Sequence, residues 1–331
     1  MTTPQAAAPA ITSLAPRRQV LDLDDFTREE IDLVLGTTES MREVLGRSIK
    51  KVPSLRGKII MTLFLEPSTR TRVSFEQAGK ILSADVINLS GSGSSAEKGE
   101  SLLNTGLTLQ AMHADLIVMR HKDSGAPYLL ARHLKHAGIV NAGDGRHAHP
   151  SQALLDLYTM RRHLGSLEGR KVVIIGDVAH SRVARSNIFG LSAAGARVVL
   201  CGPPTLLPLE LLRGRDTAYP TANVSVETDL DKAIDGADVV MALRIQTERM
   251  EGGATPSMRE YTRRWQVTEA RMRKARPNAL LMHPGPMNEG IELASSLAHG
   301  DAQRIEEQVT NGVATRMALL YLLLNGPEAS A

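Results

Sequence analysis

Short, continuous apolar runs alternate with amphipathic segments along nearly the whole chain. The runs predict strands at 58–65, 86–87, 116–119 and 139–140, and then at 172–175, 197–201, 224–226, 238–243 and 279–282. The spacing between them predicts helices at 27–45, 69–82, 101–112, 126–136, 151–163, 182–194 and 229–235, with a last apolar helix at 313–324. Continuous apolar runs are typical of parallel strands buried on both faces, so we expect an α/β fold with two doubly wound parallel sheets.

Three segments interrupt this alternation. Residues 1–16 are rich in Ala, Pro and Thr, which predicts a disordered tail. A Gly/Ser loop is expected at 90–95. A long, charged, glycine-containing loop is expected at 247–264, and it is a candidate mobile closure element.

The composition narrows the class of protein. Hydrophobic residues make up 42% of the 331 residues, which is enough for two cores, and no apolar stretch reaches membrane-spanning length. No signal sequence opens the chain, and the only cysteine is Cys201, expected in the core, so we predict a cytoplasmic protein without internal disulfides. The net charge of +3 is scattered, without an arginine-rich arm or aromatic stacking motif, which argues against nucleic-acid binding.

The segment Ser68-Thr69-Arg70-Thr71-Arg72 carries the strongest chemical signal. It follows a predicted buried strand and Glu66-Pro67, and it opens a predicted helix. A helix that begins at a strand exit directs its free backbone N–H groups and its positive dipole end toward that exit. Hydroxyl groups and a planar guanidinium at the same place predict a phosphate cradle. The alternative interpretation is a Ser/Thr cap followed by solvated arginines.

Other polar clusters of the first half also fall at predicted strand exits, where doubly wound sheets bind their ligands. Arg120 follows one strand and can reach the same anion as the first cluster if the two strands are neighbours. The glycine-rich loop 141–152 offers His149 and Gln152 at a helix start. His147 and His149 have no third ligand at a recognisable spacing, so we predict no metal site and a functional role for His149 alone.

The second half offers Arg182, Arg244 and Gln246 after its strands. Arginines gathered at strand ends favour small anionic substrates. The turn at 176–182 lacks the three-glycine spacing of a dinucleotide site, so a nicotinamide dehydrogenase is a poor match. The turn at 283–286 is rigid and can direct backbone carbonyls at a ligand, although a simple strand-terminating turn explains it equally well.

Seven segments, in this order and spacing, resemble the aspartate carbamoyltransferase family. They are FLEPSTRTRVSFE, SSAEKGES, VMRH, NAGDGRHAHPSQALLDLYT, IGDVAHSRVARS, LRIQTER and MHPGP. The resemblance runs from about residue 22 to residue 324. It implies a carbamoyl-phosphate-binding domain at 17–150, completed by a C-terminal helix at 306–331, and an aspartate-binding domain at 151–305. The implied reaction gives N-carbamoyl-L-aspartate and phosphate, an early step of de novo pyrimidine biosynthesis.

The resemblance also assigns roles position by position. The implied ligands of carbamoyl phosphate are Ser68, Thr69, Arg70, Thr71, Arg120, His149 and Gln152, together with Ser94 and Lys98 from a neighbouring subunit. The implied ligands of aspartate are Lys98, Arg182, Arg244 and Gln246, and the backbone at Pro284–Gly285 contacts the carbamoyl amine. The catalytic groups are then Arg70, Thr71, Arg120 and His149.

The implied chemistry is direct attack of the aspartate amine on the carbamoyl carbon, with no covalent enzyme intermediate, no cofactor and no metal. Arg120, His149 and Thr71 stabilise the tetrahedral oxyanion, and Arg70 and Lys98 meet the charge of the departing phosphate. The resemblance further implies a homotrimer with active sites at subunit boundaries. A larger assembly with regulatory or dihydroorotase-like chains stays open, and neither a nucleic acid nor a membrane is expected as a partner.

Two alternative functions use the same fold. An ornithine carbamoyltransferase shares the phosphate half, but it has a His-Cys-Leu-Pro turn where this chain has His283–Pro286, and it must recognise a basic amino acid where this chain presents Arg182 and Arg244. A non-catalytic subunit is the other alternative, and intact residues at every site position argue against it. Two positions depart from the family pattern: Glu289 stands where a basic residue is common, and Val183 where some relatives have a hydroxyl group.

Overall fold

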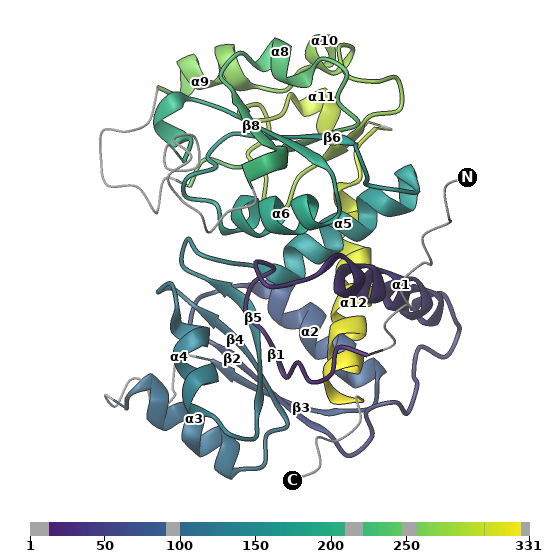
Figure 1. Ribbon diagram of the computed structural model, residues 1–331, viewed down its shortest axis with the longest axis vertical. Helices are drawn as coiled ribbons and strands as arrows, with labels where there is room; N and C mark the ends of the chain where they lie inside the picture. The colour runs from purple at the N-terminus through teal and green to yellow at the C-terminus, as the bar shows by residue number, and fades with distance from the viewer. Residues whose placement is uncertain (1–12, 91–99, 209–220, 247–256, 301, 326–331) are drawn as a thin grey trace, which may run out of the picture.

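The computed structural model describes residues 13–90, 100–208, 221–246, 257–300 and 302–325. Figure 1 shows two lobes, one built mainly from each half of the chain, with helices packed between and around two sheets. Within the described residues each sheet has five strands, and every strand pairing is parallel. The predicted fold class, a doubly wound α/β chain with two parallel sheets, is therefore confirmed.

The first sheet has the strand order β1-β5-β4-β2-β3. Its strands are β1 (Gln19–Val20), β2 (Ile59–Phe64), β3 (Asp85–Ser90), β4 (Leu116–His121) and β5 (Gly138–Asp144). The helices of this half are α1 (Arg28–Leu45), α2 (Thr69–Ile81), α3 (Leu102–Ala111) and α4 (Ala126–His133). The chain leaves β2 for β3 on one side and returns to β4 on the other, so the strand order reverses at β2 and β4.

The second sheet has the order β10-β9-β6-β7-β8 and reverses in the same way between β6 and β9. Its strands are β6 (Lys171–Ile175), β7 (Arg197–Cys201), β8 (Val224–Glu227), β9 (Val239–Ala242) and β10 (Leu280–Met282). The helical segments are α6 (Arg182–Ala193), α8 (Leu230–Ile234), α9 (Met258–Trp265), α10 (Glu269–Met272) and α11 (Ser295–Ala298), with short 3₁₀ turns at Pro204–Leu206 and Thr221–Asn223.

Each sheet is covered on both faces because successive side chains of a strand point to opposite sides. Ile60 and Phe64 of β2 join a core with α2 and the C-terminal helix, whereas Met61 and Leu63 join a separate core with α3 and α4. In β6 the same alternation sends Val172 and Ile174 to one core and Val173 and Ile175 to the other. Continuous apolar strands are what this two-sided burial requires.

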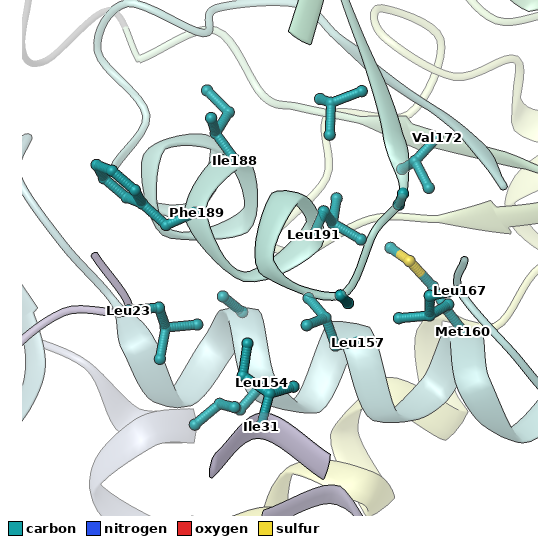
Figure 2. Close-up of a cluster of buried hydrophobic side chains, with 14 of the residues drawn as sticks. Leu23, Ile31, Leu154, Leu157, Met160, Leu167, Val172, Ile188, Phe189 and Leu191 are labelled. Atoms are coloured by element: carbon teal, nitrogen blue, oxygen red, sulfur yellow. The ribbon is translucent and has the colours of Figure 1, made fainter. Parts of the chain in front are cut away.

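Two helices connect the lobes. The helix α5 (Pro150–Leu164) is buried along most of its length and packs against α1, α6 and α12 (Ile305–Leu324). The helix α12 (yellow in Figure 1) also packs against α1 and α2 of the first half, which confirms the predicted return of the C-terminal helix. Figure 2 shows the continuous core this produces, in which Leu154 and Leu157 of α5 lie between Ile31 of α1 and Leu191 of α6.

The structure corrects several predicted elements. Part of the segment expected as a charged loop at 247–264 is the helix α9, because Ser257 accepts a capping hydrogen bond from the Glu260 N–H and buried Tyr261 and Trp265 lie one turn apart. The remainder, 247–256, lies outside the described residues. The apolar pattern predicts the start of the last helix near residue 313, but α12 begins at Ile305, close to the start at 306 that the resemblance implies. The pattern misses the first turns because they bury polar side chains. The strand β1 and the helices α10 and α11 were not predicted from the sequence.

The predicted tail at 1–16 falls mainly on residues 1–12, which lie outside the described residues, as does most of the Gly/Ser loop. The domain limits of 17–150 and 151–305 stay a prediction.

Candidate active site

The strand exits at which each sheet reverses its order open into one cleft between the lobes. The cleft has a volume of about 610 Å³. The predicted site residues that line it are Ser68, Thr69, Arg70, Thr71, Arg120, His149, Gln152, Arg182, Arg244 and Gln246, with Pro284 and Gly285. Such switch points are where doubly wound sheets bind ligands. Ser94 and Lys98 lie outside the described residues.

The first wall of the cleft is the N-terminus of α2. Ser68 occupies the N-cap position with an extended backbone, but its side chain forms no capping hydrogen bond. The Ser68 hydroxyl group therefore does not cap the start of α2. This removes the main support for the alternative interpretation, in which the segment is only a Ser/Thr cap followed by solvated arginines. No acidic side chain stands in the first turn, so the positive end of the helix dipole faces the cleft without a neutralising charge from that turn. Arg70 extends from this turn to the opposite lobe, where Cζ of its guanidinium would lie 2.9 Å from a Cβ atom on Gly285.

Glu66, which follows β2, joins two of the predicted site arginines. Its carboxylate lies 3.2 Å from Nε of Arg120, and it accepts hydrogen bonds from Nη1 and Nη2 of Arg182 at 2.8 and 3.2 Å. Because Glu66 and Arg120 belong to the first half and Arg182 to the second, this carboxylate bridges the lobes. Both arginines are nearly buried, so the bridge holds two cationic groups side by side at the cleft.

The end of β5 and the residue that follows it hold the same two guanidinium groups. Nη1 of Arg120 donates to the carbonyl of Ala142 at 3.1 Å, and Nη1 of Arg182 donates to the carbonyl of Gly145 at 3.2 Å. Between these carbonyls, Gly143 has a φ of +114°. A Cβ atom there would lie 2.9 Å from Nη1 of Arg120 and 3.1 Å from Cζ of Arg182, so glycine is what allows both arginines to pack against this backbone.

The wall supplied by the second half is built on Asp177, which is buried after β6. Its carboxylate accepts a hydrogen bond from the Gln246 backbone N–H at 3.1 Å and contacts His180 Nδ1 at 2.7 Å. Nη2 of Arg244 donates to Oε1 of Gln246 at 3.3 Å. The exits of β6 and β9 are thus tied together, and they present Arg182, Arg244 and Gln246 to one side of the cleft.

The helix α5 supplies His149 and Gln152 at the floor of the cleft. His149 is the N-cap residue, and its backbone N–H donates to Oγ of Ser186 at 2.9 Å. The amide of Gln152 donates from Nε2 to the buried carboxylate of Asp156 at 3.0 Å. Burial raises the pKa of Asp156 to about 7, although hydrogen bonds to its carboxylate oppose that shift.

Three residues that the sequence analysis considered but did not assign to the site, His147, Val183 and Glu289, occupy different places relative to the cleft. His147 lies beside Asp144 rather than in the cleft, and the hydrogen bond between their side chains raises the pKa of its imidazole. Val183 lines the cleft, as its position beside Arg182 implies. Oε1 of Glu289 lies 3.5 Å from Nε2 of His299, which belongs to the same half of the chain, so this contact does not bridge the lobes.

Sequence reasoning missed three charged or amide side chains of the cleft: Glu66, Gln308 and Arg316. Glu66 lies two residues before the segment Ser68–Arg72, but a carboxylate beside a predicted anion site gave no reason to select it. Arg316 is the single charged residue within the apolar run 313–324, which was an available signal. Its guanidinium lies 5.1 Å from the centre of the Phe75 ring, and burial lowers its pKa to about 10.

Comparison with known families and proteins identifies the family of this chain. Residues 18–162 match the family model described as the aspartate/ornithine carbamoyltransferase carbamoyl-P binding domain, and residues 168–323 match the aspartate/ornithine carbamoyltransferase Asp/Orn binding domain. The aspartate carbamoyltransferase catalytic subunit of Roseiflexus castenholzii is 57% identical over 93% of this chain and 95% of that protein. The catalytic subunit of Dehalococcoides mccartyi is 58% identical over 94% and 93%. The chain belongs to the aspartate carbamoyltransferase family.

Solved structures of related carbamoyltransferases share the fold. The ornithine carbamoyltransferase of Pyrococcus furiosus superimposes with a TM-score of 0.85 at 28% identity, over 96% of this chain and 100% of that one. The aspartate transcarbamoylase of Trypanosoma cruzi in complex with aspartate and phosphate gives 0.83 at 28% identity, over 95% and 99%. The fold therefore does not distinguish an enzyme that carbamoylates aspartate from one that carbamoylates ornithine. The more similar sequence relatives named above are both aspartate carbamoyltransferases.

Metal-binding clusters and membrane-spanning helices are both missing from the part of this carbamoyltransferase that the structure describes. Among those residues, no group of three or more His, Cys, Asp or Glu side chains is placed to hold a metal ion. No helix within the same residues is long and apolar enough to cross a membrane.

Proposed function

We propose that this aspartate carbamoyltransferase, which acts early in pyrimidine biosynthesis, transfers the carbamoyl group directly between its two substrates across the cleft. The observation that carries the proposal is the placement of cationic groups from both lobes around one cavity. Arg70 and Arg120 come from the first half, and Arg182 and Arg244 from the second. Two anionic substrates that must meet at a short distance require this kind of two-sided, preorganised site.

Carbamoyl phosphate is proposed to bind against the first half. The free N–H groups of α2, the hydroxyls of Ser68, Thr69 and Thr71, and the guanidinium of Arg70 supply donors for the phosphate oxygens. Arg120 reaches both the phosphate and the carbonyl oxygen. His149 at the start of α5 donates to the carbonyl oxygen.

Aspartate is proposed to bind against the second half, where Arg182, Arg244 and Gln246 hold its two carboxylates. The contact between Arg182 and Glu66 supports this role, because the guanidinium already binds one carboxylate through both terminal nitrogens. A substrate carboxylate must share Arg182 with Glu66 or displace it. Ornithine would bring an ammonium group toward these arginines, and like charges in a desolvated site are unfavourable.

The reaction then needs no nucleophile from the protein. The aspartate amine nitrogen attacks the carbamoyl carbon, and the bond from that carbon to the phosphate oxygen breaks as inorganic phosphate leaves. Arg120, His149 and Thr71 stabilise the oxyanion that forms on the carbonyl oxygen. The proton lost by the amine is proposed to go to the departing phosphate. A pH profile assigned to His149 as the base would contradict that last step.

Substitution of Arg244 tests the aspartate half. Arg244→Ala should raise the KM for aspartate at least about tenfold and lower kcat, because a carboxylate loses its charged partner and the amine loses its orientation. Binding of carbamoyl phosphate should change little, since its proposed ligands lie on the other lobe. Arg273→Ala, which removes an exposed arginine from the same half, is the matched control. An unchanged KM for aspartate in Arg244→Ala would overturn the assignment.

We further propose a homotrimer in which Ser94 and Lys98 complete the site of the neighbouring subunit. Lys98→Ala and His149→Ala should each be inactive alone. Mixing the two variants under conditions that exchange subunits should restore activity, because hybrid trimers contain boundaries at which both residues are intact. Remixing each variant with itself is the control. Confirmed exchange without recovered activity would contradict a shared site. A cytoplasmic location and the binding of regulatory or dihydroorotase-like chains stay predictions.

A further inference from the structure

A buried carboxylate lies directly behind the floor of the cleft. Asp156 stands on α5 one turn after Gln152 and is fully buried. Three side-chain amides donate to it: Gln152 and Gln308 to Oδ1 at 3.0 and 2.7 Å, and Asn187 to Oδ2 at 2.9 Å. These amides come from α5, α12 and α6, so the carboxylate joins the three helices that meet beneath the site.

Backbone groups independently fix the orientation of two of these amides. Oε1 of Gln308 accepts a hydrogen bond from the His283 N–H at 3.0 Å, so a flipped Gln308 amide would set donor against donor at His283. Nδ2 of Asn187 donates to the Val183 carbonyl at 3.0 Å, so a flipped Asn187 amide would set acceptor against acceptor. Both amides must therefore direct their NH₂ groups at Asp156, and both carboxylate oxygens act as acceptors.

The orientation of the third amide follows from the other two. Oδ1 of Asp156 accepts from Gln308 and Oδ2 accepts from Asn187, so the oxygen that Gln152 contacts, Oδ1, already acts as an acceptor. Gln152 must then donate its NH₂ to Asp156 and leave its carbonyl oxygen for the cleft that it lines. A carbonyl oxygen can accept from the amine of carbamoyl phosphate, whereas a turned amide would set two NH₂ groups against each other.

We infer that Asp156 is a positioning residue that fixes the amide of Gln152 with its carbonyl oxygen toward the carbamoyl amine, so that the cleft distinguishes carbamoyl phosphate from phosphate itself. This inference rests on the proposed function, which places the carbamoyl group at Gln152. The discrimination arises because inorganic phosphate has no amine to contact Gln152. The proposed ligands of the phosphate group, at the start of α2 and on Arg120, are the same for both molecules. Asp156 itself does not line the cleft and acts only through its neighbour.

Equilibrium binding tests this role without turnover. Asp156→Ala should weaken binding of carbamoyl phosphate by about tenfold or more, while the dissociation constant of inorganic phosphate stays within about twofold. Gln152→Ala should show the same selective loss, and the double variant should bind carbamoyl phosphate no more weakly than Gln152→Ala alone. Asn187→Ala disturbs the other carboxylate oxygen and is the matched control, for which both dissociation constants should be retained.

Three results would overturn the inference: unchanged carbamoyl phosphate binding in Asp156→Ala, an equal loss for phosphate, or additive losses in the double variant. Thermal unfolding shows whether each variant is folded. If Asp156→Ala is not, Asp156→Asn keeps the volume and one acceptor oxygen, and the same selective loss is expected at smaller size. Carbamoyl transfer to aspartate by the unsubstituted enzyme is assayed separately, so a failure of the proposed function is distinguished from a failure of this role.

Discussion

The packing of two arginines against Gly143 leads to a specific prediction for Gly143→Ala. The residue has a φ of +114°, which side chains rarely adopt, and a Cβ atom there would lie 2.9 Å from Nη1 of Arg120. The same atom would lie 3.1 Å from Cζ and from Nε of Arg182. One methyl group would therefore displace a proposed ligand of carbamoyl phosphate and a proposed ligand of aspartate together.

The expected size of the effect has two parts. A non-glycine residue in this backbone conformation destabilises the fold by about 1–3 kcal/mol, which lowers Tm by several degrees in a chain of this size. Displacement of guanidinium groups from their productive positions should lower kcat/KM roughly a hundredfold, equivalent to about 3 kcal/mol of transition-state stabilisation. The loss of activity should therefore exceed what a modest loss of folded protein can explain.

The assay measures carbamoyl aspartate formation per folded molecule, with Tm recorded for each variant. Gly57→Ala is the matched control, because Gly57 also has a positive φ, of +85°, but a Cβ atom there would meet no atom of the described residues within 4 Å. Gly57 precedes β2 and therefore lies at the N-terminal ends of the parallel strands, opposite the strand exits that open into the cleft. This control should lose stability while keeping its specific activity. Near-normal specific activity in Gly143→Ala, or an equal loss in Gly57→Ala, would refute the packing argument.

Three further predictions concern single residues. Glu66→Gln should lower kcat at least about tenfold, because Arg120 and Arg182 lose the carboxylate that holds both, while phosphate should bind no more weakly, since the cleft becomes more positive; weaker phosphate binding would contradict this. Arg70→Ala should lower kcat/KM for carbamoyl phosphate at least about a hundredfold with an unchanged circular dichroism spectrum, and near-normal turnover would exclude the phosphate cradle. Burial raises the pKa of Cys201 to about 12, so the native thiol should react slowly with a disulfide reagent at about pH 8 and quickly after unfolding, and fast native reaction would show that the thiol is accessible.

Much of the fold was predictable because the strands are buried on both faces. The apolar runs Val172–Ile175 and Val198–Cys201 contain no charged position, and the strands predicted at 172–175 and 197–201 agree with β6 and β7 to within one residue. The strand β1 has two residues and carries too little pattern to detect. The start of α12 was hidden for another reason: Gln308 and Asn311 are buried through hydrogen bonds to other side chains rather than through apolar contact.

The residues of the candidate site also fall into a group that sequence predicts and a group that it does not. Residues such as Arg70 and Arg244 follow strands directly, so topology alone predicts that they face a common cleft. Glu66 and Asp156 could not be selected in that way, because their importance lies in which arginine or amide they contact after folding. Sequence pattern places strand exits, whereas partners across the two lobes depend on packing that no local pattern contains.

The most direct test of the proposed function is the choice of acceptor. Purified enzyme is given carbamoyl phosphate with either L-aspartate or L-ornithine at equal concentration, and phosphate release and the carbamoylated amino acid are both measured. Arg182 and Arg244 at the cleft predict rapid formation of N-carbamoyl-L-aspartate and little or no product from ornithine. Faster phosphate release and product formation with ornithine than with aspartate would contradict the account.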